Sequence, residues 1–436
     1  MAMRCSPLTF LLTGIAWLLI MALGGMALYV GTIRSTPLPA TLRVLHVHGA
    51  LIGGVLQLLV GAWLAHRRVL HPNKTGGQWA RYAALNLGTL LMSIGFGLHQ
   101  YVLVGLAGLL AIAPLLPLCG DVVAWAKQGS LGPTWAPWFS LFVVTALVVG
   151  CGLGAGYSLG LIPSEWIIHA RLAHVHVLVQ GFLVAIGIGL AQPLLTAALQ
   201  RELVAPRLAT LASAGVLLGI AILLAGFFTA QVPLQLGAGG LLLLSLLLMG
   251  FSLLRTWSAA PTRSAAADYL LLGFLFLTLG TGLGLLVSLN ALSDPRPMPF
   301  GTLHLVAYTH LIFVGFILAT VFGGLSAWFP ILVAEARVSS HKKRGPYLEK
   351  LRAAMTRWTL AQMGTLALGT MGLSAVAALT WQHPMSSAPV QSMMWVSLAF
   401  LLASLALFAA QLAMTWGLPT QDPESAAALP PTSPRP

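Results

Sequence analysis

The sequence predicts an all-α integral membrane protein with twelve transmembrane helices in three pseudo-symmetric four-helix arcs. Three observations predict this class: an apolar composition, a series of apolar runs of spanning length, and a threefold internal repeat. Of the 436 residues, 58% are hydrophobic and 7% are charged, and the mean hydropathy is +0.89. Soluble domains carry about 25% charged residues, so this composition indicates a protein of the lipid bilayer.

A helix needs about 20 mostly apolar residues to cross a bilayer, and twelve stretches reach that length. The first follows a short segment containing Arg4 and is too long for the core of a cleaved signal peptide, which indicates an uncleaved span. The predicted limits are 10–31, 42–65, 80–98, 102–126, 137–161, 165–195, 207–230, 233–254, 268–290, 300–333, 358–381 and 391–415. They predict one membrane domain over residues 1–417 and a disordered cytoplasmic tail over 418–436, which is rich in Pro, Ser and Ala.

The formal net charge of +13 comes mainly from basic residues in alternate loops, after spans two, four, six, eight and ten. The largest group lies between Arg337 and Arg357. This pattern argues against a nucleic-acid partner and follows the positive-inside rule. It predicts a bacterial-type inner membrane protein with both termini cytoplasmic, so that spans two, six and ten enter from the outer face.

Cysteine usage predicts no disulfide framework. Cys5, Cys119 and Cys151 are scattered and form no Cys-x-x-Cys pair, so a thiolate metal site is not indicated either.

Spans two, six and ten carry the repeat. Their sequences are RVLHVHGALIGGVLQLLVG, RLAHVHVLVQGFLVAIGIG and LVAYTHLIFVGFILATVFG. Aligned on His48, His176 and His310, which are 128 and 134 residues apart, each copy has glycine five and thirteen residues later. These glycines either let neighbouring helices approach closely or clear space for a flat macrocycle. Four spans separate successive copies, which predicts three parallel four-helix units.

Six histidines fall in the outer half of these three spans. They are His46, His48, His174, His176, His304 and His310. Ionisable groups at this depth are costly and mark candidate functional sites. Residues two apart on a helix point to roughly opposite sides, so the two histidines of a His-x-His pair serve two separate sites. The alternatives are hydrogen bonding between helices and ligation of haem iron or copper, for which imidazole is a common donor.

Two arginines accompany the histidines. Arg43 and Arg171 lie five residues outward of His48 and His176. They either extend to water at the membrane interface or neutralise anionic haem propionates. Tyr308, four residues after His304, is interpreted as an aromatic residue of the membrane interface.

In these residues the chain resembles the catalytic subunit of the haem-copper oxidase superfamily. That family has twelve helices in three arcs, and its metal ligands lie on helices two, six, seven and ten near the outer face. The stretch HVHGALIGG, from His46 to Gly54, is similar to its His-x-His stretch. The resemblance implies one or two b-type haems, possible copper, a small gas ligand, and an electron-donor protein or quinol. Under it the candidate metal ligands are His48, His176 and His310, then His46, His174 and His304, with Arg43 and Arg171 at the cofactor.

The chain also departs from that family. Predicted span seven has no histidine, and the interior carboxylates are almost limited to Asp121, so neither a three-histidine copper centre nor proton pumping is expected. The pattern is closer to a divergent relative such as the NnrS-type haem membrane proteins. Two other functions stay open: a transporter of a metal ion or small solute that uses the histidines, and a metal-free assembly subunit.

Overall fold

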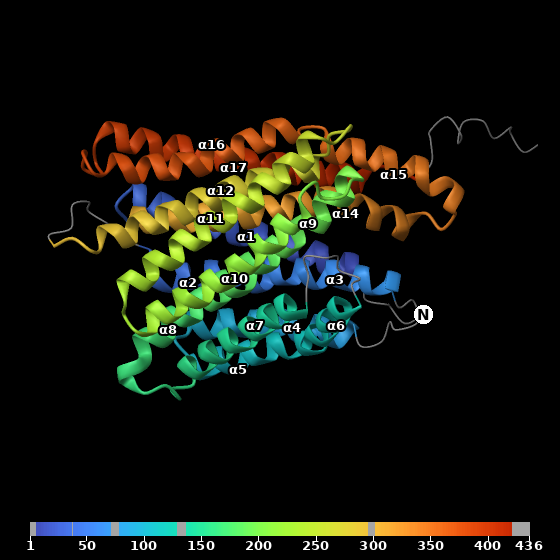
Figure 1. Cartoon of the computed structure of the whole chain (residues 1–436). Coiled ribbons are helices and arrows are strands. Elements are labelled where there is room, and N and C mark those ends of the chain that lie inside the picture. The colour runs from blue at the N-terminus through green and yellow to red at the C-terminus, as the bar shows by residue number, and fades with distance from the viewer. Residues whose placement is uncertain (1–5, 37, 71–77, 129–136, 295–300, 421–436) are drawn as a thin grey trace, which may run out of the picture.

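The computed structural model describes residues 6–36, 38–70, 78–128, 137–294 and 301–420, and within them it confirms an all-α membrane protein. Eleven of its helical segments are long and apolar enough to cross a bilayer. Figure 1 shows them side by side in one bundle. The predicted third span is a helix of 20 residues whose polar side chains, Arg81 and Asn86 among them, leave it less apolar than the other spans.

Nine spans lie outside the repeat. Eight of them are single helices: α1 (Pro7–Ile33), α4 (Gln78–Gly97), α7 (Pro137–Ser158), α10 (Pro206–Phe228), α11 (Val232–Ser258), α12 (Ala265–Asn290), α16 (Thr359–Leu379) and α17 (Ala388–Gly417). The fourth span is divided into α5 (Tyr101–Ile112), the 3₁₀ turn η2 (Ala113–Leu115) and α6 (Leu116–Lys127). Pro114 and Pro117 lie at this division, where proline interrupts the α-helical hydrogen bonds.

Spans two, six and ten share an unusual helical structure. Each contains an eight-residue π-helix between two α-helices. The segments are α2 (Ala40–His48), η1 (Gly49–Leu56) and α3 (Gln57–Leu70); α8 (Ile167–His176), η4 (Val177–Val184) and α9 (Ala185–Leu199); and α13 (Thr302–His310), η5 (Leu311–Leu318) and α14 (Ala319–Arg337). A short 3₁₀ turn, η3 (Ser164–Trp166), precedes α8. π-Helices are rare and occur often at functional sites. Since all three begin at the residue after the aligned histidine, the structure repeats as the sequence does.

The helices form three arcs that close into a ring. Neighbouring outer helices contact one another from α4 and α5 through α7, α10, α11, α12 and α16 to α17, and α17 contacts α1. Spans two, six and ten pack against α1, α7 and α12, which are the first helices of the three arcs. Side chains of α1 and α4 complete the ring, because Thr13 and Tyr82 are hydrogen-bonded at 2.9 Å.

Glycines of the repeat let each of these three spans approach the helix before it. A Cβ atom on Gly53, Gly181 or Gly315 would meet a side chain of α1, α7 or α12 at 2.6, 3.0 and 2.6 Å, respectively. Gly61 and Gly323 face α1 and α12 in the same way, at 3.1 and 3.0 Å. Of the two roles that the sequence left open for these glycines, the structure supports close helix packing.

The basic segment after span ten is helical and not only a loop. It forms α15 (His341–Thr356), whose apolar side chains Tyr347, Leu351 and Met355 are buried. In Figure 1, α15 lies at the same end of the bundle as α3 and α14, whereas α2 and α8 lie at the other end. The predicted disordered tail lies outside the described residues from position 421 onward.

Replacement of Gly88 tests the packing of α4 against α5. A Cβ atom at Gly88 would lie 2.7 Å from the backbone nitrogen of Ala111 and 2.8 Å from the carbonyl oxygen of Ala107, and backbone atoms cannot rotate away. We expect Gly88→Ala to lower the free energy of unfolding by about 1–3 kcal/mol. Thermal unfolding in detergent, followed by tryptophan fluorescence, measures the change. Gly97→Ala is the control on the same helix, because its Cβ would meet no atom within 4 Å. Equal melting temperatures would contradict the close contact.

Candidate functional site

The three aligned histidines are the last residues of the α-helices that precede the π segments. The Nδ1 atoms of His48, His176 and His310 lie 2.9, 2.8 and 2.7 Å from the carbonyl oxygen of the residue four positions earlier. A carbonyl oxygen only accepts hydrogen bonds, so each neutral ring carries its proton on Nδ1 and donates it. The three side chains therefore share one environment and one tautomer.

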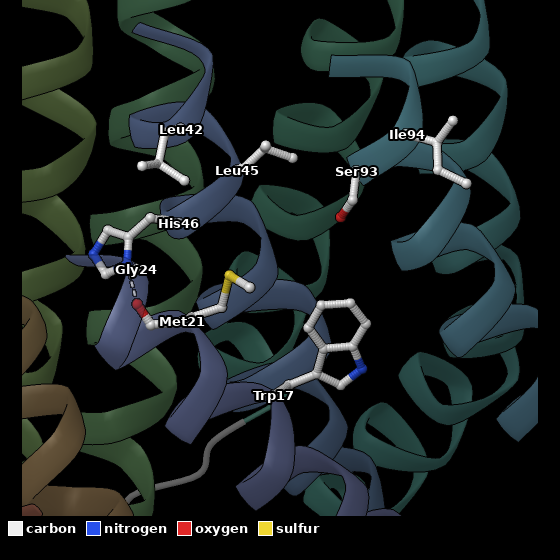
Figure 2. A pocket seen from close by; sticks show the side chains of 8 residues that line it. All are labelled: Trp17, Met21, Gly24, Leu42, Leu45, His46, Ser93 and Ile94. Atoms are coloured by element: carbon white, nitrogen blue, oxygen red, sulfur yellow. Dashed lines mark hydrogen bonds between the residues drawn. The ribbon is translucent and has the colours of Figure 1, made fainter. Parts of the chain in front are cut away.

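His46 and His174 form a second equivalent set. Nδ1 of His46 donates to the carbonyl oxygen of Met21 on α1 across 2.6 Å, as Figure 2 shows. Nδ1 of His174 donates to the carbonyl oxygen of Gly150 on α7 across 2.8 Å. The two histidines of each His-x-His pair thus have different backbone partners, one on the preceding span and one on their own helix.

A glycine of the preceding span makes room for each ring of this second set. A Cβ atom on Gly25 or Gly154 would lie 2.5 Å from Cε1 of the histidine beside it. The third repeat has Tyr308 at the corresponding position, and a Cβ atom on Gly284 would lie 3.0 Å from its Cε2. These glycines are 129 and 130 residues apart. Their spacing, which extends the repeat to spans one, five and nine, is the sequence signal that would have identified them.

All five histidines leave the Nε2 atom open. Within the described residues, their hydrogen bonds are made through Nδ1, and the side chains are half-buried. A neutral imidazole whose Nδ1 donates to a carbonyl presents the Nε2 lone pair, which is the form that ligates metals. The five histidines therefore have the electronic form of metal ligands.

His48 and His174 form the best-defined pair. Their ring centroids are 6.4 Å apart and their planes differ by 13°. This distance exceeds the optimal separation of about 3.5–4 Å for carbon atoms in contact, so the rings do not pack face to face. Two metal–nitrogen bonds of about 2 Å, with roughly 1 Å from each nitrogen to its ring centre, give about 6 Å. The centroid distance therefore matches that expected for two imidazoles bound to one metal ion.

The other aligned histidines have different neighbours. His310 lies close enough to His46 for the two rings to interact electrostatically. His176 packs against Phe227 at 4.3 Å and 49°, just as His48 packs against Phe96 at 4.9 Å and 50°. One ring pair, His48 with His174, therefore joins two repeats, and His310 and His46 lie within electrostatic range of each other.

His304 differs from the other five predicted ligands. Its Nδ1 accepts a hydrogen bond of 3.1 Å from the backbone N–H of Gly301 at the start of α13. Its ring lies nearly parallel to that of Trp381, with centroids 5.4 Å apart. An accepting Nδ1 places the proton of the neutral ring on Nε2, which is the opposite tautomer. This geometry gives no support to a ligand role for His304.

The remaining predicted residues are placed as follows. Arg43 and Arg171 are exposed on α2 and α8, on the outer side of the histidines, and both of their predicted roles stay open. Tyr308 is not an aromatic of the membrane interface as the sequence suggested, because its ring packs against the main hydrophobic core. Asp121 on α6 pairs with Arg67 at 3.2 Å and takes no part in the histidine arrangement.

An apolar cavity of about 310 Å³ opens beside His46, between α1, α2 and α4. Trp17, Leu45 and Ser93 are among the side chains that line it (Figure 2). Ligand pockets have volumes of about 300–1,000 Å³. The cavity is therefore large enough for a hydrocarbon chain or a small neutral molecule.

The donor sets fit the two axial positions of haem iron better than a copper centre. Among the described residues, no three His, Cys, Asp or Glu side chains gather closely enough to hold a metal ion. The pairs instead supply two neutral nitrogen donors, which is the number that haem iron takes in a bis-histidine site. The residues whose geometry fits this role are His48 and His174.

Comparison with models of known protein families and with curated proteins finds no match. The fold and the site define a multi-pass helical membrane protein with paired imidazoles at one end of its bundle.

Replacement of Gly154 tests whether the glycine positions the ring beside it. Because the new Cβ would lie 2.5 Å from Cε1 of His174, we expect Gly154→Ala to displace that ring. The affinity of one site for haem added to the haem-free protein should fall by about tenfold or more, as when supporting contacts of metal ligands are removed. Gly152→Ala, on the same helix with no atom within 4 Å of its Cβ, is the control. If both folded variants bind haem equally, the glycine does not position the ring.

Proposed function

We propose that this chain is a haem-binding membrane redox protein resembling the catalytic subunit of haem-copper oxidases. It binds or reduces a small gas, oxygen or nitric oxide, or passes electrons. The observation that carries the proposal is the His48–His174 pair, two near-parallel imidazoles with ring centroids 6.4 Å apart and both Nδ1 protons engaged by carbonyl groups.

The protein's part in this function is to hold and orient the donors. The carbonyl oxygens of Val44 and Gly150 fix the rotation and tautomer of the two rings and raise the basicity of Nε2. Haem, if bound between these donors, would supply a one-electron redox change.

Arg43 and Arg171 are suited to the outer edge of such a cofactor. Each precedes the first histidine of its repeat by three residues, and both are exposed at the histidine end of the bundle. Haem propionates are anionic, and a guanidinium group pairs with carboxylates through two parallel hydrogen bonds. We therefore assign the two arginines to propionate binding.

The proposed orientation places the histidines near the outer face of a bacterial-type inner membrane. The basic helix α15 lies at the end of the bundle opposite α2 and α8 (Figure 1). Basic segments stay on the cytoplasmic side. Both termini are then cytoplasmic, and electrons reach the histidine end from an outer donor protein or from a quinol within the bilayer.

The apolar cavity beside His46 is the proposed entry point for a quinol donor, and Gly24→Leu tests this. A Cβ at Gly24 would meet no atom within 4 Å, so a leucine fits there and occupies the cavity. We expect reduction by a short-chain quinol to slow by about three- to tenfold, because the leucine would fill the cavity that is the proposed contact surface of the quinol. Reduction by dithionite should not change and serves as the control. An unchanged quinol rate would exclude this cavity as the entry point.

Paired histidine variants test the proposed function itself. Protein purified from haem-replete cells should give a reduced-minus-oxidised b-type spectrum. His48→Ala and His174→Ala should each reduce the same spectral component, about tenfold or more, because both histidines are proposed to hold the same group. The double variant should lose no more than either single variant, since both act on one group. His341→Ala, on exposed α15, is the control. A colourless wild-type protein would contradict haem binding, and ion uptake by that protein in proteoliposomes would favour the transporter.

A further inference from the structure

A group of charged and aromatic side chains lies where α3 ends and α4 begins, away from the histidines. Arg67 is three residues before the end of α3, Arg81 lies in the first turn of α4, and Asp121 lies on α6. In Figure 1, α3 lies at the end of the bundle opposite α2 and α8. The group therefore belongs to spans two, three and four and is separate from the proposed haem site.

Two guanidinium groups share one carboxylate in this group. Nε of Arg67 lies 3.2 Å from Oδ2 of Asp121, and Arg81 lies within electrostatic range of both side chains. Asp121 is the first acidic residue of the sequence, and the next, Glu165, precedes α8 at the histidine end. Because like charges repel at short range, the second guanidinium group favours a further anion beside it.

Nitrogen atoms around this ion pair are buried without a hydrogen-bond partner among the described residues. They include Nη1 of Arg81, Nε1 of Trp63 and Nε2 of His66. Trp63 shares a face of α3 with His66 and Arg67, which follow it by three and four residues. The Trp63 and His66 rings both pack on Trp125 of α6, at centroid distances of 4.4 and 4.9 Å. Guanidinium and indole N–H groups only donate hydrogen bonds, and a buried donor without an acceptor costs free energy, so the group favours a ligand that supplies acceptor oxygens.

The group opens to the surface near the boundary of the bilayer. The side chains of Arg67 and Asp121 are 17% and 26% exposed. At a rise of about 1.5 Å per residue, Arg81 lies about 5 Å from the start of α4 and Asp121 about 9 Å from the end of α6. The first turn of α4 has no acidic residue, and the N-terminal end of a helix carries a partial positive charge that attracts anions. The group is therefore accessible to an anion from the lipid headgroups or from the adjacent water.

We propose that Arg67 and Arg81 hold a phosphate group at this end of spans two, three and four. A guanidinium group binds phosphate through two parallel hydrogen bonds, and phosphate oxygens also accept from an indole N–H group such as that of Trp63. The negative charge of the phosphate balances the second guanidinium group. The phosphate comes from an anionic phospholipid or from a soluble phosphate, which present the same acceptor oxygens. This inference does not depend on haem binding.

Native mass spectrometry tests the lipid source. The full-length protein is released from nanodiscs that contain equal amounts of phosphatidylglycerol and phosphatidylcholine, and the retained phospholipid is measured. Arg81→Gln should reduce the retained phosphatidylglycerol by about tenfold or more, because charge-assisted hydrogen bonds are lost. Arg207→Gln is the matched control, since Arg207 is an exposed arginine in the first turn of α10, and it should change retention by less than about twofold.

Calorimetric titration of the detergent-solubilised protein with inorganic phosphate tests the soluble source. Arg81→Gln should weaken binding by about tenfold for the same reason. Asp121→Asn should act in the opposite direction and strengthen binding by about three- to tenfold, because it removes the carboxylate that competes for the guanidinium groups. A purely structural role for this group would predict weaker binding in both variants.

The two measurements separate the sources and can overturn the inference. Lipid retention that falls in Arg81→Gln assigns the site to a phospholipid, and phosphate binding that falls in Arg81→Gln assigns it to a soluble phosphate. A wild-type protein that shows neither, or a folded Arg81→Gln variant that behaves as the wild type in both, overturns the inference. If Arg81→Gln does not fold, Asp121→Asn decides: tighter binding in either measurement supports the inference, and unchanged or weaker binding in both overturns it.

Discussion

The histidine end of this protein depends on one interaction, the hydrogen bond from an imidazole Nδ1 to a backbone carbonyl oxygen. Inside a bilayer there is little water to pair with a polar ring, and an unsatisfied N–H group costs several kcal/mol. The carbonyl groups of Val44, Leu172 and Val306 remove that cost for the three aligned histidines. The same bond fixes the tautomer and leaves Nε2 for a ligand. A requirement of folding in lipid therefore also prepares the ring for metal binding.

Close packing by glycine is the second requirement, because the other two hydrogen bonds cross between helices. His46 and His174 reach carbonyl groups on α1 and α7 across 2.6 and 2.8 Å. Those distances are possible only if spans one and two, and spans five and six, approach closely, and Gly53 and Gly181 permit that approach. The packing glycines and these histidines are therefore linked, because close contact between the helices determines where each imidazole lies.

The sequence predicted the spans and the repeat but not the pairing of the histidines. Hydropathy located the helices because spanning length is fixed by the bilayer, and the His-x-His spacing correctly implied that His46 and His48 have different partners. Which histidines pair depends on how each helix is rotated about its axis, and the sequence of one span does not determine that rotation. His304 shows the same limit. It shares predicted depth and residue type with the other five predicted ligands, yet its tautomer is set by the N–H group of Gly301, which only the helix start brings into place.

The π-helices also could not be predicted from the sequence, because they arise from backbone hydrogen bonding and not from a residue pattern. Their position after His48, His176 and His310 shows that the backbone, as well as the side chains, keeps the threefold relation. The departures from that relation then become informative. Tyr308 and Gln180 are recognised as departures from the repeat only when the three repeats are compared as helices, with the glycines that face each ring and the carbonyl acceptors aligned.

The pairing also means that the histidine site depends on the whole circle of helices and not on one arc. His48 and His174 come from the first and second arcs, and His310 and His46 come from the third and first. Each metal bridged by such a pair would join two arcs that otherwise associate through helix packing alone. Binding to the folded state and not to the unfolded state stabilises the former. Under the proposed function, cofactor binding and closure of the helix ring from α17 to α1 would therefore be coupled.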